Sequence, residues 1–187
     1  MKVLKWKPWI FTILLIVLFV NIPNLARLIY PVQYIDHIKK QAEEYHVDPY
    51  LIMSMIKAES NFDKDAVSHR KATGLMQITE PTANWLAQRM GIEDFQYANI
   101  TDPSINIEMG CYYMAYLLDL YQGDKKNALA AYNAGEGTVG QWLLDEACSK
   151  DGKTLTYVPY PETRHYIAQV SNNETIYRLL YNIKPSA

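Results

Sequence analysis

The chain has 187 residues, of which 49% are hydrophobic and 20% are charged, and its formal net charge is −2. This composition is typical of a folded globular protein and excludes a highly charged, disordered chain. The first 30 residues contain four basic groups and no acid, so residues 31–187 keep 14 of the 18 basic residues and all 20 acidic ones. The resulting charge of −6 argues against a nucleic-acid partner, so none is expected.

The N-terminal segment combines three lysines with a long apolar stretch. No charged residue stands between Lys7 and Arg27, and the intervening residues 8–26 are mostly large and apolar. A helix of roughly 20 such residues spans the hydrocarbon core of a bilayer. The segment therefore predicts contact with the cytoplasmic membrane through residues 8–26.

A cleaved secretory signal has a similar basic start and apolar run, so cleavage is the alternative to anchoring. Asn24 stands where a cleavable signal would carry a small residue, which favours an uncleaved anchor. We predict that residues 1–30 form a cytoplasmic N-terminus and a transmembrane signal-anchor. Because basic residues flank the cytoplasmic side of such spans, residues 31–187 are expected on the extracytoplasmic face of a single-pass protein.

The remaining 157 residues suffice for one well-buried core and are few for two, so one domain is expected. Cys111 and Cys148 are the only cysteines and lack metal-ligand spacing. Either they are separate buried thiols, or they pair as the exported location permits. The sequence does not decide between these alternatives.

Helix signals recur along this domain, with acids directly before prolines marking two helix starts. We expect helices over residues 34–46, 50–59, 80–90, 103–122, 124–134, 137–147 and 161–182. Gly91 and Gly135 are plausible helix stops. Residues 60–79 and 149–160 are expected to be irregular, with a possible short strand over 154–158. The fold class is mainly α with little or no sheet, behind an N-terminal membrane-anchor helix.

The helix over 50–59 places an acid within its apolar face. At about 100° per residue, Glu59 falls inside the stripe formed by Leu51, Ile52, Met55 and Ile56. Burial disfavours the charged carboxylate and raises its pKa, and the C-terminal end of the helix dipole acts in the same direction. An acid protonated near neutral pH suits general-acid cleavage of a glycosidic bond. The alternative is a structural ion pair between Glu59 and Arg164.

Four motifs follow one another along the chain: Glu59-Ser60-Asn61-Phe62, Gly74-Leu75-Met76-Gln77-Ile78, Ala131-Tyr132-Asn133-Ala134-Gly135 and Pro161-Glu162-Thr163-Arg164-His165-Tyr166. In this order they resemble the soluble lytic transglycosylase (SLT) family of peptidoglycan-cleaving enzymes. The resemblance covers about residues 35–182. It implies a lysozyme-like α-helical catalytic domain over residues 31–187, acting on the glycan strands of peptidoglycan.

The resemblance implies cleavage between N-acetylmuramic acid and N-acetylglucosamine, with a 1,6-anhydro-muramyl product. Glu59 would act first as the acid and then as the base. Ordinary glycosidases need a second carboxylate, and Asp63 and Asp65 are not at positions that the family uses. Two alternatives remain: a muramidase that delivers water on the same fold, and a non-catalytic peptidoglycan-binding scaffold.

The resemblance also implies substrate-binding positions, each with a structural alternative. Ser60 orients the Glu59 carboxyl or a substrate N-acetyl group, or else caps its helix. Met76 and Gln77 form a loop wall that contacts sugar amides, with core filling as the alternative for Met76.

The third and fourth motifs supply three further substrate-binding positions. Tyr132 and Asn133 face the groove, although an interior tyrosine with a satisfied hydroxyl is the alternative for Tyr132. Glu162 is a binding carboxylate, or else a helix-terminal charge or a partner of Arg164.

Two other patterns are not taken as functional. Residues 135–140 fit G-x-G-x-x-G but follow a helix rather than a strand, so a dinucleotide site is not expected. These glycines are expected to join two closely packed helices. No metal-ligand or calcium-loop spacing occurs, and we predict no metal and no cofactor.

Overall fold

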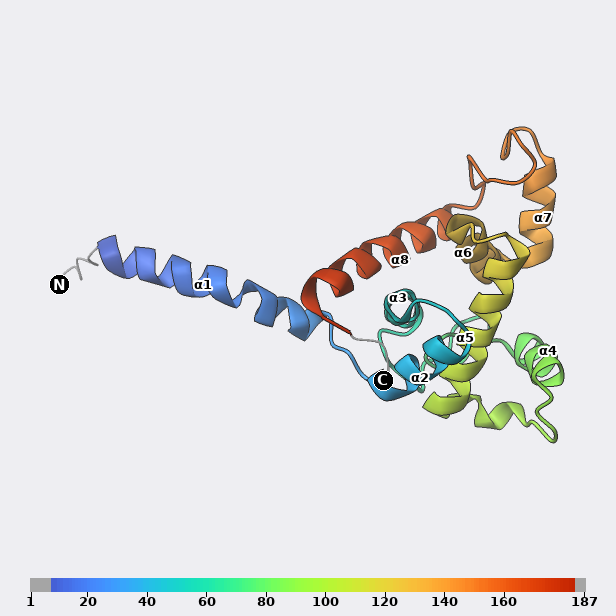
Figure 1. Ribbon diagram of the computed structural model, residues 1–187, viewed down its shortest axis with the longest axis horizontal. Helices are drawn as coiled ribbons and strands as arrows, with labels where there is room; N and C mark the ends of the chain where they lie inside the picture. The colour runs from blue at the N-terminus through green and yellow to red at the C-terminus, as the bar shows by residue number, and fades with distance from the viewer. Residues whose placement is uncertain (1–7, 184–187) are drawn as a thin grey trace. The chain divides into compact units, whose positions relative to one another are not determined.

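The structure is a computed structural model, and it describes residues 8–183 (Figure 1). The chain divides into two compact units, with the boundary between Val32 and Gln33. The first unit contains helix α1, Pro8–Ile29, and the second contains all the other helices.

Helix α1 is apolar on all sides and has Pro23 within it. It is the one helix in the described part of the chain that is long and apolar enough to cross a membrane, with a mean hydropathy of 2.2 and no buried residue in the most apolar window of Trp9–Ile29. Its length and composition match the span expected over residues 8–26. Its role as an anchor remains a proposal.

The second unit is helical, as predicted. Its elements are α2 (Ile35–Glu44), α3 (Pro49–Glu59), α4 (Glu80–Met90), the 3₁₀ helix η1 (Tyr97–Thr101), α5 (Pro103–Leu120), α6 (Lys125–Ala134), α7 (Glu136–Leu144) and α8 (Pro161–Leu180). The expected helices are all present with shifts of a few residues at their ends, and η1 was not predicted. The possible strand over 154–158 is reduced to an isolated bridge between Ser149 and Leu155.

Side-chain caps explain several of these boundaries. The Asp48 carboxylate accepts from the backbone N–H of Tyr50 at 2.9 Å, and Pro49 occupies the first turn of α3. Gly91 ends α4 with a φ of 68°, a conformation that glycine adopts without a Cβ penalty. Helices α6 and α7 do pack together, but Gly137 and Gly140 are not needed for it, because a Cβ added to either would meet no atom within 4 Å.

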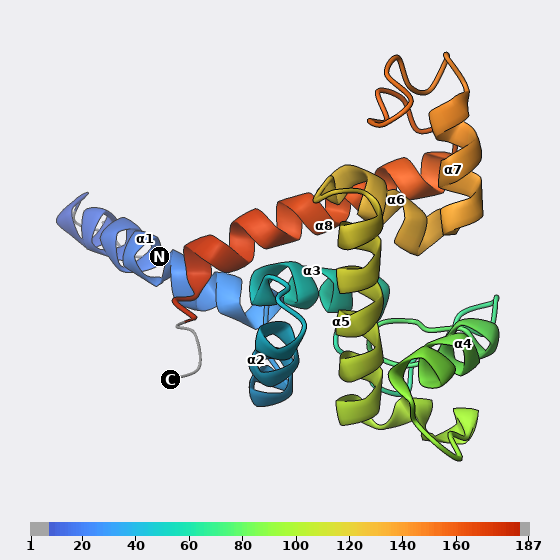
Figure 2. The same ribbon diagram turned by 45° about the vertical axis from the view of Figure 1, so that its right-hand side comes forward.

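Helix α3 is the centre of this unit. Its six consecutive residues 51–56 are all buried, and it packs against α8 and α2 (Figure 2). A helix buried on nearly every side is expected to be apolar on nearly every side. Helix α6 packs against α5, α7 and α8, so α3 and α6 share α8 as a common neighbour.

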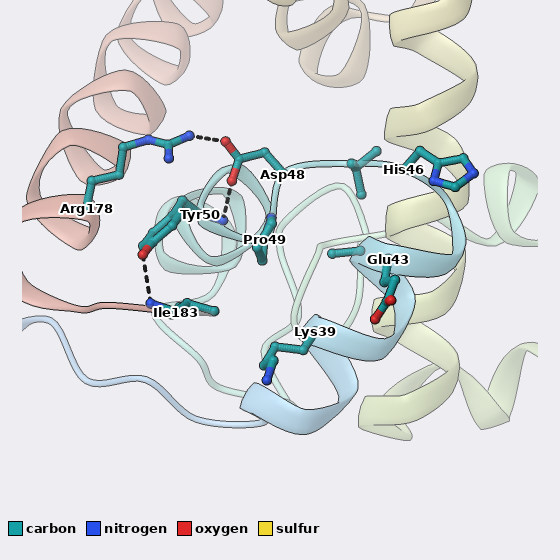
Figure 3. Close-up of a pocket in the computed structure, with 10 residues that line it drawn as sticks. Lys39, Glu43, His46, Asp48, Pro49, Tyr50, Arg178 and Ile183 are labelled. Carbon is teal, nitrogen blue, oxygen red and sulfur yellow. Dashed lines mark hydrogen bonds and ion pairs between the residues drawn. The ribbon is translucent and has the colours of Figure 1, made fainter. Parts of the chain in front are cut away.

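The start of α3 is fixed to the C-terminal part of the unit (Figure 3). Arg178 of α8 pairs with Asp48, and the Tyr50 hydroxyl donates to the Tyr181 carbonyl at 3.0 Å while accepting from the Ile183 N–H at 2.9 Å. Of these residues, Asp48, Tyr50, Arg178 and Ile183 line a pocket of about 380 Å³. It lies at the first turn of α3, roughly 15 Å along the helix from Glu59.

Candidate active site

Glu59 is the last residue of α3, where the helix emerges from the core. Its pKa is raised from 4.5 to about 7, mainly because burial disfavours the carboxylate and further because the charge of Glu162 is close. The side chain nevertheless keeps partial exposure. Glu59 is therefore a carboxyl group that changes protonation near neutral pH and can still be reached from outside.

Tyr166 of α8 is the residue that opposes this shift. It is 6% exposed, its own pKa is raised by burial and by Glu59, and its interaction with the carboxylate lowers the pKa of Glu59. The hydroxyl meets no partner with full hydrogen-bond geometry among residues 8–183. It is thus a buried donor directed to the Glu59 carboxylate, and it strengthens its bond when that group ionises.

Arg164 is not the partner of Glu59. Its guanidinium donates to the carbonyls of Val158 at 2.6 Å and Pro159 at 2.9 Å, and it lies over the Tyr157 ring. The structural ion pair considered for Glu59 is therefore absent from the described part of the chain.

Ser60 follows Glu59 and connects the end of α3 to the loop. Its hydroxyl lies 2.8 Å from the carbonyl of Leu75 and 3.2 Å from that of Ile56. Since a hydroxyl has one proton, the shorter contact directs it to Leu75. The oxygen lone pairs remain able to accept from a ligand.

The loop wall is held in place by Asn106 of α5. The Asn106 side chain accepts from the Met76 N–H at 2.7 Å and donates to the carbonyls of Thr73 at 3.1 Å and Ile100 at 2.9 Å. Gly74 has a φ of 83°, and a Cβ added there would lie 2.3 Å from the Asn106 amide nitrogen. The close approach of loop and helix therefore requires a glycine at 74.

The side chain of Met76 lies in the core and not at the predicted substrate contact. Its side chain is fully buried, and its sulfur occupies the space next to Gly110, 2.0 Å from where a Cβ on that glycine would stand. Met76 therefore fills the core, as in the structural alternative. Its carbonyl oxygen, not its side chain, faces Tyr132.

Gln77 is half-buried, and its side-chain NH₂ group donates hydrogen bonds within the loop. It donates to the carbonyls of Gly74 at 2.9 Å and Ala66 at 3.0 Å, in a backbone with a φ of 47°. The amide thus closes the loop on itself. Only the side-chain oxygen of Gln77 is left to receive a hydrogen bond from a ligand.

Tyr132 links α6 to the loop. Its hydroxyl donates to the Met76 carbonyl at 2.8 Å, and burial together with the nearby Glu59 charge raises its pKa well above 10. Beside it, the Asn133 side-chain oxygen accepts from the Thr163 hydroxyl at 2.7 Å, which leaves the Asn133 NH₂ group as the available donor.

Glu162 lies in the first turn of α8 and is exposed. Arg70 pairs with it at 3.6 Å, and both side chains are more than half exposed. An exposed pair contributes little to stability, so Glu162 is a charged group at the rim rather than a structural one. The partner suggested by the sequence, Arg164, is engaged elsewhere.

The structure brings together Glu59, the Ser60 hydroxyl, Tyr132, Tyr166 and the charge of Glu162. Sequence reasoning gave Tyr166 no role, although the helical spacing places it one turn after Glu162 on the same face of α8. No group of three or more acidic, histidine or cysteine side chains that could hold a metal occurs within residues 8–183. Cys111 and Cys148 are separate buried thiols.

Comparisons with known proteins identify the family of this chain. The family model described as "Transglycosylase SLT domain" matches residues 36–154, and the chain belongs to this family. The predicted resemblance and its lysozyme-like fold are thereby confirmed.

Two individual relatives have more specific names than the family. The chain is 29% identical over 159 residues to the soluble lytic murein transglycosylase of Escherichia coli K12, covering 84% of this chain and 25% of the relative. It is 31% identical over 169 residues to the membrane-bound lytic murein transglycosylase C of Serratia proteamaculans, covering 78% and 47%. The chain thus spans between a quarter and about half the length of these relatives.

Solved structures show the same fold. The 70-kDa soluble lytic transglycosylase of Escherichia coli superposes with a TM-score of 0.73 at 28% identity, over 83% of this chain and 26% of that one. An inactive mutant of the lytic transglycosylase Slt from Pseudomonas aeruginosa gives a TM-score of 0.72 at 27% identity, over 85% and 26%.

Proposed function

We propose that this chain is a membrane-anchored peptidoglycan lytic transglycosylase that cleaves the bond between N-acetylmuramic acid and N-acetylglucosamine. The observation that carries the proposal is the half-buried Glu59, whose pKa is about 7, in a domain of the SLT family. A group with this pKa can give and take a proton at neutral pH.

The proposed chemistry uses Glu59 twice. The protonated carboxyl donates to the glycosidic oxygen as the bond to C1 of the muramyl sugar breaks, and the N-acetyl oxygen of the same sugar stabilises C1. The Glu59 carboxylate then takes the proton of the C6 hydroxyl while O6 bonds to C1. The product is a 1,6-anhydro ring, and no water is consumed.

Neighbouring groups support both halves of this cycle. Burial keeps Glu59 protonated before cleavage, and Tyr166 stabilises the carboxylate formed afterwards. Glu162 is exposed and paired with Arg70, which suits a binding carboxylate and not a second proton donor.

Substrate contacts in this proposal come from the atoms left available. Hydrogen bonds from the sugar amides and hydroxyls are accepted by the Ser60 hydroxyl oxygen and the Gln77 side-chain oxygen. The NH₂ group of Asn133 donates a hydrogen bond to the sugar. Tyr132 shapes the wall through its bond to the loop. The structure gives no side-chain role of this kind to Met76, which is buried.

We further propose that α1 is an uncleaved anchor in the bacterial cytoplasmic membrane. The supporting observation is the exposed apolar surface of Trp9–Ile29, and relatives named as membrane-bound share the family. In this proposal residues 1–30 hold the N-terminus inside, and residues 31–187 are a catalytic domain on the outer face. Full-length protein in the membrane fraction supports this, whereas a shortened, released protein would contradict it.

The catalytic proposal is tested by release of soluble fragments from purified peptidoglycan, with the full chain in detergent micelles. Glu59→Gln should lower the rate by roughly 100- to 10,000-fold, the contribution typical of a general acid. Glu146→Gln is the matched control, since Glu146 is exposed beyond the end of α7. Comparable rates for Glu59→Gln and the wild type would reject the role of Glu59.

A further inference from the structure

Helix α1 carries two asparagines, Asn21 and Asn24, within its apolar length. The span proposed to cross the membrane is residues 8–26, which is centred on Val17. At about 1.5 Å of rise per residue, Asn21 lies roughly 6 Å and Asn24 roughly 10 Å from the middle of this span. The hydrocarbon core extends roughly 15 Å to either side of its middle. In an anchored chain, both amides therefore lie inside the hydrocarbon.

These amides use only part of their hydrogen-bonding capacity within α1. The Asn21 NH₂ group donates to the Val17 carbonyl at 2.8 Å. The Asn24 NH₂ group lies 3.4 Å from the Asn21 side-chain oxygen, a long contact, and the Asn24 oxygen accepts from Arg27 at 3.0 Å. An amide has two donor hydrogens and two acceptor lone pairs. Each asparagine thus keeps one donor and one acceptor position for a partner outside the described part of the chain.

The two asparagines lie on one narrow face of α1. At about 100° per residue, six residues separated by alternating steps of four and three form a stripe roughly 80° wide. They are Ile10, Leu14, Val17, Asn21, Asn24 and Leu28, and we call this stripe the asparagine face. Thr12, Phe19 and Pro23 project from the opposite side, so the proline ring does not interrupt the stripe.

The spacing of the asparagine face is that of helices in continuous contact. Alternating steps of four and three keep one side of a helix against a neighbouring helix over several turns. Polar side chains inside a membrane face other protein groups and not lipid, because an unpaired amide in hydrocarbon is costly. Spacing and polarity therefore both indicate that a second helix packs on this face.

The asparagine face is complementary to itself. An amide carries partial positive charge on its NH₂ group and partial negative charge on its oxygen, so two copies of Asn21 can each donate to the other. Copies of one single-pass chain all cross the membrane in the same direction, so two copies of α1 are parallel. A buried asparagine in such a repeat favours a parallel pair of helices in register. A different helix would need a polar group at the same depth, which a second copy supplies by symmetry.

We propose that two copies of this chain associate in the membrane through the asparagine face of α1, with the Asn21 amides of the two helices bonded to each other. This inference rests on the proposed anchor, because it takes α1 to remain in the bilayer. The association ties two copies of residues 31–187 to one place on the membrane, which raises their local concentration at a shared glycan strand.

The first test is sedimentation equilibrium of the full chain in density-matched detergent micelles, which gives the dissociation constant of the dimer. Asn21→Leu keeps a side chain of similar size and removes the amide. It should raise the dissociation constant roughly 3- to 30-fold, the range found for polar pairs between membrane helices. Thr12→Leu is the matched control, since it makes a polar-to-apolar change on the opposite side and should leave the dissociation constant unchanged.

The second test is cross-linking in native membranes with a membrane-permeable oxidant. Val17 lies in the asparagine face and Phe19 lies opposite, so Val17→Cys should join two copies of the chain and Phe19→Cys should not. The native thiols Cys111 and Cys148 are buried, and the unsubstituted chain measures their background. Adding Asn21→Leu to Val17→Cys should lower the yield of the joined pair.

Four results would overturn the inference. They are a full-length chain that stays monomeric in micelles, equal dissociation constants for Asn21→Leu and Thr12→Leu, equal cross-linking of Val17→Cys and Phe19→Cys, and cross-linking of Val17→Cys to a different protein. The last result would assign the asparagine face to another membrane helix.

The outcome is separable from that of the proposed function. A monomeric, full-length chain in the membrane that releases peptidoglycan fragments would remove the dimer and leave the anchored enzyme. A dimer that depends on Asn21, with no cleavage of peptidoglycan, would keep the interface and remove the enzyme. A chain shortened by loss of α1 would remove the anchor and the dimer together and leave the catalytic proposal in place.

Discussion

The raised pKa of Glu59 predicts a specific dependence of folding stability on pH. Its carboxyl group has a pKa of about 7 in the folded chain, against 4.5 as the ordinary value. Between these two pH values the folded state holds a proton that the unfolded state has lost. The free energy of unfolding therefore falls as pH rises from about 4.5 to about 7, and the full cost is present above pH 7.

The size of this cost follows from the shift itself. One pKa unit corresponds to about 1.4 kcal/mol, so the shift of Glu59 destabilises the folded state by roughly 3 kcal/mol above pH 7. Glu59→Gln removes the titration and keeps a neutral side chain of similar shape. The variant should match the wild type near pH 4 and exceed its stability by roughly 3 kcal/mol near pH 8.

The assay is urea unfolding of the full chain in detergent micelles, followed by tryptophan fluorescence between pH 4 and pH 8. The stability difference between wild type and variant isolates Glu59, because the other titrating groups contribute to both. Glu146→Gln, at an exposed position beyond the end of α7, is the matched control. A difference for Glu59→Gln that is constant with pH, or that favours the wild type at high pH, would refute the assignment of a buried, protonated Glu59.

Three substitutions test the surroundings of the site. Tyr166→Phe should lower the rate of fragment release about tenfold or more, because the hydroxyl favours the Glu59 carboxylate. At pH 5, where Glu59 is protonated, it should leave the unfolding free energy nearly unchanged, since the hydroxyl then has no fully formed hydrogen bond to lose; a large loss of stability with normal activity would contradict this. Gly110→Ala should destabilise by roughly 1–3 kcal/mol in urea unfolding, because its Cβ overlaps the Met76 sulfur, whereas Gly137→Ala, with open space around it, should not. Asn106→Ala should cost about 3 kcal/mol or more by leaving the Met76 N–H and two carbonyls without their partner, and a loss below 1 kcal/mol would show that the loop wall is held otherwise.

The helices of the second unit were predictable because their signals are local. Asp48 and Pro49 mark the start of α3, and Gly91 marks the end of α4 through its positive φ. The environment of Glu59 was also predictable, since its place on the apolar face follows from helical spacing alone. The 3₁₀ helix η1 was missed because its five residues carry no comparable period.

Side-chain direction in the loop was not predictable. Met76 and Gln77 were both assigned to the wall, yet Met76 turns into the core and Gln77 bonds its own loop. These directions depend on Asn106, which is 30 positions from Met76 in sequence. An asparagine in an apolar helix gives no sign of which distant backbone it will bind.

The most direct test of the central claim is the mass of fragments released from purified peptidoglycan by the full chain in detergent micelles, with Glu59→Gln in parallel. Mass spectrometry should show muropeptides one water lighter than reducing ends, and Glu59→Gln should release none of them. Fragments with ordinary hydrated ends would instead identify a muramidase. Binding to the wall without any released fragment would contradict catalysis altogether and identify a scaffold.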